Sequence, residues 1–117
     1  MTTATHETAH VNEVRLVGRL SADPAQLTMP SGDTVWTFRL VVERTGVGAR
    51  RGQQLDTLDC AVWSGRAKRS VASWAVGDLV EVNGAIRRRF YAAGAAKVSR
   101  YQVEVGSGRV IRRAASG

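Results

Sequence analysis

The chain has 117 residues, with 17 Lys and Arg against 10 Asp and Glu and a formal net charge of +7. That length suits one domain with a modest core, and the basic excess favours polyanionic partners or anionic membrane surfaces. No apolar run approaches the roughly 20 residues that span a bilayer, and the polar start does not resemble a secretory signal. We therefore expect a soluble intracellular protein.

The first part of the chain predicts a tail, a strand and a long connection. Residues 1–10 have no periodicity, so we expect a disordered tail. Residues 11–20 alternate apolar and other side chains as a half-buried strand does, and Gly18 predicts a bend within it. Residues 21–33 carry both prolines and end in a turn signal, which predicts a long connection.

Two further strands are expected around a basic loop. Residues 34–44 place one apolar set in a single phase: Trp36, Phe38, Leu40 and Val42. Residues 45–54 contain three glycines and two arginines and predict a flexible hairpin loop. The third strand follows over residues 55–63. It contains the single cysteine, Cys60, which excludes an internal disulfide and is expected to be a small apolar strand residue.

The rest of the chain predicts one helix and two more strands. Residues 65–77 have apolar positions at helical spacing and close on Gly77. Strands are expected over residues 78–91 and 98–105, with a frayed end at residues 112–117. Five strands with one helix between the third and fourth is the order of an OB-fold, an all-β barrel that binds oligonucleotides. We expect this domain to cover residues 11–111.

Catalysis is not expected. Both histidines, His6 and His10, fall in the predicted tail, and no Ser or Cys has an evident general base. No glycine-rich phosphate loop and no set of metal ligands is recognisable in the sequence. We therefore expect neither an enzyme nor a cofactor or metal site.

The densest basic cluster is the run IRRRFY at residues 86–91. Because side chains of a strand alternate between its faces, we expect Arg87, Arg89 and Tyr91 to share one face. Successive members of this row are two residues apart, which is about 7 Å along a strand. Guanidinium groups can contact phosphate or stack on bases, and a tyrosine offers a flat ring to a base. Arg88 falls in the other phase, and we expect it at the rim of the barrel or against an adjacent subunit. The alternative is a solvated edge strand charged against aggregation.

The three tryptophans are expected to serve packing. Trp36 alternates with Phe38 and Leu40, Trp63 alternates with Ala61, and Trp74 lies on the apolar face of the predicted helix. We expect Trp36 and Trp63 to pack in the core or against another subunit, and Trp74 to lie in the core.

Motifs along most of the chain resemble those of bacterial single-stranded DNA-binding proteins. They are VNEVRLVGRLSADP, MPSGDTVWTFRLVVER, LDCAVWSGRAKRSVASWAVGDLVEVNGAIRRRFY and RYQVEV, in colinear order from about residue 11 to residue 109. The Cys-x-x-Trp spacing at residues 60–63 looks most like actinobacterial members. The resemblance implies an OB-fold that assembles as a homotetramer in the cytoplasm, at the nucleoid, and wraps single-stranded DNA in replication, repair or recombination.

The chain departs from the family pattern at several positions. Tyr91 occupies the stacking position after the Arg-x-Arg motif, but two other aromatic positions of the family fall at Leu58 and Ser64. The sequence stops without the acidic tail that recruits replication proteins. It therefore resembles a shortened paralogue, or a phage or plasmid copy.

Two functions follow as hypotheses. The first is sequence-independent binding of single-stranded DNA, and the second is an OB-fold accessory of replication or the primosome that acts mainly through protein contacts. No membrane partner is expected, and the apolar strand phases suit a dimer as well as a tetramer. The residues expected to contact DNA are Arg87, Arg89, Tyr91, Arg39, Arg50, Arg51, Arg100, Phe90 and Trp36.

Overall fold

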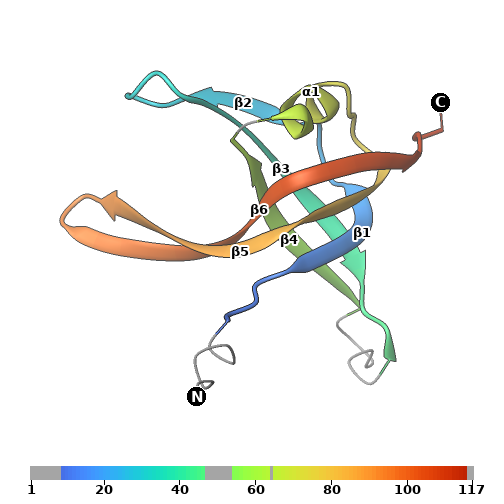
Figure 1. Cartoon of the computed structure of the whole chain (residues 1–117), viewed down its shortest axis with the longest axis horizontal. Coiled ribbons are helices and arrows are strands. Elements are labelled where there is room, and N and C mark those ends of the chain that lie inside the picture. Colours follow the sequence, from blue (N-terminus) through green and yellow to red (C-terminus); the bar gives the residue numbers. More distant parts are fainter. Residues whose placement is uncertain (1–8, 47–53, 64, 116–117) are drawn as a thin grey trace, which may run out of the picture.

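The computed structural model describes residues 9–46, 54–63 and 65–115, apart from the side chains of residues 91–93. The elements are, in order, β1 (Val14–Leu20), β2 (Ala25–Thr28), β3 (Thr34–Glu43), β4 (Leu55–Val62), α1 (Arg66–Ala72), β5 (Leu79–Ala93) and β6 (Ala96–Arg112). Figure 1 shows the strands curled around one another, with α1 at one end and the β5–β6 hairpin reaching far to the side.

Five of the described strands close into a ring. Their order along the sheet is β1, β5, β6, β4 and β3, and β1 pairs again with β3. The neighbours are antiparallel except β4 and β6, which run parallel where Cys60 pairs with Val103. The ring closes at Arg19, which pairs with Leu79 of β5 and with Val41 of β3. The expected all-β OB-fold is confirmed, with the single described helix between β4 and β5.

Two glycines permit close approach between strands of the ring. A Cβ atom at Gly18 would lie 2.5 Å from the carbonyl oxygen of Val41, one residue before β1 changes partner. A Cβ atom at Gly84 would lie 1.9 Å from the carbonyl oxygen of Glu104, beside the bulge where the β5–β6 register passes over Gly106. A side chain at either position would push the strands apart, so the curvature of the barrel depends on both glycines.

Apolar side chains from each of these five strands fill the ring. The fully buried aliphatic residues of this core include Leu20, Leu40, Val62, Val80 and Val82. Helix α1 covers one end by burying Ala67 and Val71. Trp74 follows the helix, is 5% exposed and packs edge-on against Phe38 with the ring centroids 5.5 Å apart. The prediction that Trp74 belongs to the core is confirmed.

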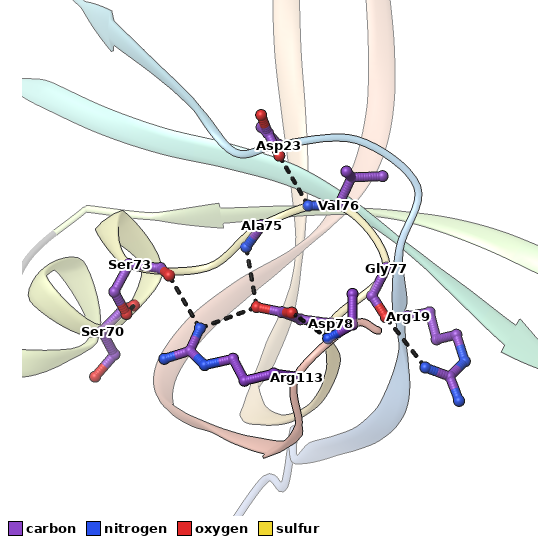
Figure 2. A network of polar contacts seen from close by, with 10 residues as sticks. Arg19, Asp23, Ser70, Ser73, Ala75, Val76, Gly77, Asp78 and Arg113 are labelled. Carbon is purple, nitrogen blue, oxygen red and sulfur yellow. Dashed lines mark hydrogen bonds and ion pairs between the residues drawn. The ribbon is translucent and has the colours of Figure 1, made fainter. Parts of the chain in front are cut away.

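A buried carboxylate ties the segment after α1 to the end of β6 (Figure 2). Asp78 is 2% exposed and accepts hydrogen bonds from the backbone N–H groups of Ala75 and Ala114 and from the guanidinium of Arg113. Burial opposes its ionisation, but these hydrogen bonds outweigh that effect and lower the pKa of Asp78. The chain is thus hydrogen-bonded as far as Ala114, whereas the sequence predicted a frayed end from residue 112.

Several elements differ from those predicted. The connection over residues 21–33 contains β2, whose four side chains are all exposed and therefore lack the alternation that marks a half-buried strand. The helix ends at Ala72, five residues before Gly77, because the following turns position Asp78. Strands β5 and β6 are also longer than expected, since they pair up to Ala93 and Ala96.

Candidate nucleic-acid interface

The arginine cluster lies on the β5–β6 hairpin, and the pairing of the two strands separates its members. The cross-strand pairs are Arg87 with Gln102, Arg88 with Tyr101, Arg89 with Arg100 and Phe90 with Ser99. Arg87 and Arg89 therefore share one face, while Arg88 and Phe90 occupy the other. Ile86 and Phe90, which share the strand phase of Arg88, are more exposed than a barrel interior allows, at 47% and 66%. The reason is that the hairpin extends beyond the core.

Both outward arginines converge on one glutamate of β6. The Nε of Arg87 donates to Oε1 of Glu104 at 2.9 Å, and a guanidinium nitrogen of Arg89 lies 3.7 Å from the same oxygen. The side chain of Arg87 remains 51% exposed and that of Arg89 remains 35% exposed. One partly exposed carboxylate therefore faces two cations, and the guanidinium groups can still reach an anion from solvent.

Trp63 lies on the same face as Arg89, outside the barrel core. It alternates with Val62, which points into the core, and it is only half-buried. The guanidinium carbon of Arg89 lies 5.2 Å from the centre of the Trp63 ring, within cation–π range. Trp63 therefore does not pack in the core of this chain, and its ring belongs to the arginine face. Its packing against another subunit, the alternative, stays a prediction.

A second cluster of arginine and aromatic rings occupies the opposite face of the hairpin. The guanidinium of Arg88 lies 5.1 Å from the Phe90 ring and 5.6 Å from the Tyr101 ring, and it donates to the Ser99 hydroxyl. Phe90 is 66% exposed and Tyr101 is 67% exposed. Tyr101 was not among the residues expected from the sequence. Its proximity to Arg88 depends on the register of β5 and β6, and the loop that joins these strands has no sequence feature that reveals the register.

Two hollows adjoin each other across the outer face of β3 and β4. The first, of about 210 Å³, is lined by residues that include Arg39, Asp59, Arg100 and Tyr101. The second, of about 290 Å³, is lined by residues that include Val35, Trp63, Arg89 and Phe90. Thr37 and Gln102 line both hollows, so the two form one continuous groove. We refer to it below as the outer groove.

The outer groove brings together some of the predicted DNA-contacting residues and not others. Arg39 and the exposed Arg100 line it, although Arg39 is also paired with Asp59 at 3.0 Å. Trp36 instead packs against the core, in the opposite phase of β3. Arg50 and Arg51 lie outside the described residues, as does the side chain of Tyr91, whose backbone pairs with Val98.

The thiol that lines the groove is not activated as a nucleophile. Burial, reinforced by the charge of Asp59, raises the pKa of the Cys60 thiol to about 12, so Cys60 is protonated at neutral pH. Among residues 9–46, 54–63 and 65–115 there is no group of three His, Cys, Asp or Glu side chains placed to hold a metal ion. Nor does the described part of the chain include a helix long and apolar enough to cross a membrane.

Leu58 occupies the position where the resemblance places an aromatic residue. It lines a small hollow of about 100 Å³ together with Tyr101, Ile86 and Asp59. The exposed Tyr101 ring of β6 therefore lies close to Leu58, where β4 has no aromatic ring. Ser64, the other position without its aromatic residue, lies outside the described part of the structure.

Comparisons with known proteins agree with this geometry. Residues 11–112 match the model of the Single-strand binding protein family. The chain is 38% identical over 81 residues to "Single-stranded DNA-binding protein 1" of Staphylococcus aureus, covering 69% of this chain and 48% of that protein. It is 35% identical over 81 residues to "Single-stranded DNA-binding protein A" of Bacillus subtilis, covering 69% and 47% respectively. The chain thus spans about half the length of the curated relatives it matches.

A solved structure shows the same fold. The structure "Plasmodium falciparum SSB complex with ssDNA" superposes with a TM-score of 0.70 at 18% sequence identity, covering 89% of this chain and 96% of that one. The family match extends from three residues before β1 to the last residue of β6. The chain therefore belongs to the single-strand binding protein family.

Proposed function

We propose that this chain binds single-stranded DNA without reading its sequence, along the outer groove and the adjoining β5–β6 hairpin. The observation that carries the proposal is the gathering of Arg39, Arg87, Arg89 and Arg100 on one face beside the Trp63 ring. The names of the matched relatives, together with the ssDNA in the Plasmodium falciparum complex, support the same ligand.

The arginines would provide affinity and the rings would hold the bases. Guanidinium groups contact phosphate oxygens through a fork of donors, and they do so for any sequence. Aromatic rings stack on any base, at about 1 to 3 kcal/mol per base. Binding of this kind tolerates the missing aromatic residues at Leu58 and Ser64 if Trp63, Phe90 and Tyr101 contribute instead. The function is one of binding, and no catalytic step is part of it.

A titration with fluorescently labelled oligo-dT at two salt concentrations tests the proposal. On single strands each neutralised phosphate contributes about 0.7 to the slope of log affinity against log salt. Four or more arginine contacts therefore predict a steep fall in affinity as salt rises, with similar affinities for oligo-dT and mixed sequences. Affinity that does not change with salt would contradict the proposal.

We also propose that the protein is a homo-oligomer, a tetramer in the first instance and a dimer as the alternative, working on DNA in the cytoplasm. The resemblance to bacterial single-stranded DNA-binding proteins, which implies a homotetramer, supports this part of the proposal. Light scattering with and without oligo-dT would give the molar mass. A monomer at micromolar concentration, with or without DNA, would contradict this part of the proposal.

A further inference from the structure

We propose that helix α1 carries a second contact for the bound strand, at which Arg66, Lys68 and Arg69 hold phosphate groups beyond the outer groove. This inference rests on the proposed function and extends the path of the DNA over one end of the barrel. None of the three residues belongs to the set expected from the sequence to contact DNA.

The basic side chains of α1 carry charge that the described structure does not neutralise. Arg66 and Arg69 are exposed and lie three residues apart, on neighbouring positions of the helix surface, and Lys68 is half-buried. Other arginines, such as Arg39 and Arg113, face an aspartate at 3.0 Å. No carboxylate among the described residues forms an ion pair with the three cations of α1. They are therefore available to an anion from solvent.

The exposed side of α1 suits a polyanion better than a protein partner. Its exposed side chains are Arg66, Arg69 and Ala72, so no large apolar side chain of the helix faces solvent. Protein interfaces gather aromatic and large apolar side chains at their centre, whereas surfaces that bind nucleic acid are strongly basic. Like charges three residues apart also weaken a helix slightly. Arg66 and Arg69 thus repel each other in the free protein, and a phosphate chain would relieve that repulsion.

Helix α1 adjoins the outer groove at two points. Trp63 lines the groove at the end of β4, and the helix begins three residues later at Arg66. The ammonium of Lys68 donates to the hydroxyl of Thr34, whose neighbour Val35 also lines the groove. Lys68 therefore lies between the groove and the exposed arginines. A strand that follows the groove can pass directly onto the helix.

This second contact would add affinity without adding sequence preference. Arginine and lysine side chains contact phosphate oxygens whatever base the nucleotide carries. The contribution would depend on the length of the strand, because only a strand long enough to leave the outer groove reaches α1. Length dependence therefore distinguishes the α1 contact from the contacts of the groove itself.

Oligomers of two lengths test the α1 contact. Arg66→Ala/Arg69→Ala should bind oligo-dT of about 16 nucleotides about 5- to 25-fold more weakly than the wild type at about 0.1 M salt, with a salt slope smaller by about 1.4. For oligo-dT of about 6 nucleotides, near the lower end of OB-fold site sizes, the affinity should match that of the wild type. Unchanged affinity for the longer oligomer would overturn the inference, and so would an equal loss for both lengths.

Control variants separate the charge on α1 from other effects. Arg66→Lys/Arg69→Lys keeps both cations and should bind the longer oligomer almost as the wild type does. Arg15→Ala/Arg109→Ala removes the same charge from another face, and an equal loss there would assign the effect to net charge and overturn the inference. Alanine favours helices, so Arg66→Ala/Arg69→Ala should keep its melting temperature. Should it unfold, Arg66→Gln/Arg69→Gln removes the same charge, and the two lengths decide in the same way.

The two proposals fail in different ways. If the wild-type protein binds neither length of oligo-dT, the proposed function is wrong. If the wild type binds with steep salt dependence while Arg66→Ala/Arg69→Ala keeps the wild-type affinity and slope for the longer oligomer, DNA binding holds and only the α1 contact is wrong.

Discussion

Two glutamates of the β5–β6 hairpin each face a pair of arginines, yet the two clusters differ in how completely the charges are matched. Glu81 accepts hydrogen bonds from Arg15 and, at 2.8 Å, from Arg109, and its side chain is 10% exposed. Glu104 faces Arg87 at 2.9 Å and Arg89 at 3.7 Å, and its side chain is 35% exposed. The Glu81 cluster uses both carboxylate oxygens, whereas the Glu104 cluster relies on one.

This difference in charge matching gives the Glu81 cluster a structural role and leaves the Glu104 cluster able to bind an anion. The hydrogen bonds from Arg15 and then Arg109 outweigh burial and lower the pKa of Glu81, as expected for a carboxylate that joins β1, β5 and β6. Glu104 neutralises its two arginines incompletely, and one of these, Arg89, makes a cation–π contact with Trp63 at the outer groove. Similar composition therefore gives a structural contact in one case and an exposed cationic surface in the other. We refer to Glu81 with Arg15 and Arg109 as the closed cluster, and to Glu104 with Arg87 and Arg89 as the open cluster.

The largest effect should come from removing the open cluster. The double variant Arg87→Ala/Arg89→Ala should bind oligo-dT on the order of 10- to 100-fold more weakly at about 0.1 M salt, because two charged contacts to phosphate are lost. Fluorescence anisotropy measures the affinity. The matched control is Arg15→Ala/Arg109→Ala, which removes the same charge. If both variants lose affinity equally, net charge and not the outer groove controls binding.

Removal of the closed cluster should act on stability instead. Glu81→Gln leaves Arg15 and Arg109 without a carboxylate at a nearly buried position, so we expect the melting temperature to fall by several degrees. Affinity for oligo-dT should stay within about twofold of the wild type. Thermal unfolding followed by circular dichroism measures the first quantity. A stable Glu81→Gln variant with altered DNA affinity would reverse the roles assigned to the two clusters.

Acid should weaken the contacts of two buried carboxylates, Glu81 and Asp78. The pKa values of Glu81 and Asp78 are lowered in the folded protein, so their stabilisation is present above the ordinary carboxyl pKa of about 4 and is lost as the pH falls through the folded values. The melting temperature should therefore drop below about pH 4. Glu81→Gln should show a smaller drop over the same range, and an identical acid profile would contradict the role of Glu81.

A much smaller effect is expected from neutralising Glu104. In Glu104→Gln both outward arginines lose their competing carboxylate, so affinity for oligo-dT should rise, by a few-fold at low salt. The gain should disappear at high salt, where exposed charges are screened. Weaker binding by Glu104→Gln would mean that the carboxylate positions the arginines and does not compete with DNA.

The barrel could be predicted because its signals are local. Alternation placed Phe38 and Leu40 in the core and separated Arg87 from Arg88, and helical spacing identified Trp74 as a core residue. β2 could not be predicted, since its side chains are all exposed and its only partner among the described strands is β3. Helix α1 was predicted too long because the turns around Asp78 also contain apolar residues.

The site was predictable only in part because it depends on register. The approach of Glu104 to Arg87 follows from the register that the β5–β6 turn sets, in which Ala93 pairs with Ala96 and Arg87 with Gln102, and no pattern in the sequence reveals that register. The sequence leaves Trp63 between the core and a subunit contact because both phases of β4 are apolar near its end, and only the ring closure shows which phase points inward. Tyr101 was missed for the same reason as Glu104.

The salt dependence of the two double variants tests most directly whether the open cluster is the DNA contact. Log affinity for oligo-dT should be measured against log salt for the wild type, Arg87→Ala/Arg89→Ala and Arg15→Ala/Arg109→Ala. Loss of two phosphate contacts should reduce the slope by about 1.4 in the first variant and leave it unchanged in the second. A slope that stays at the wild-type value in Arg87→Ala/Arg89→Ala would contradict the assignment of the open cluster to DNA.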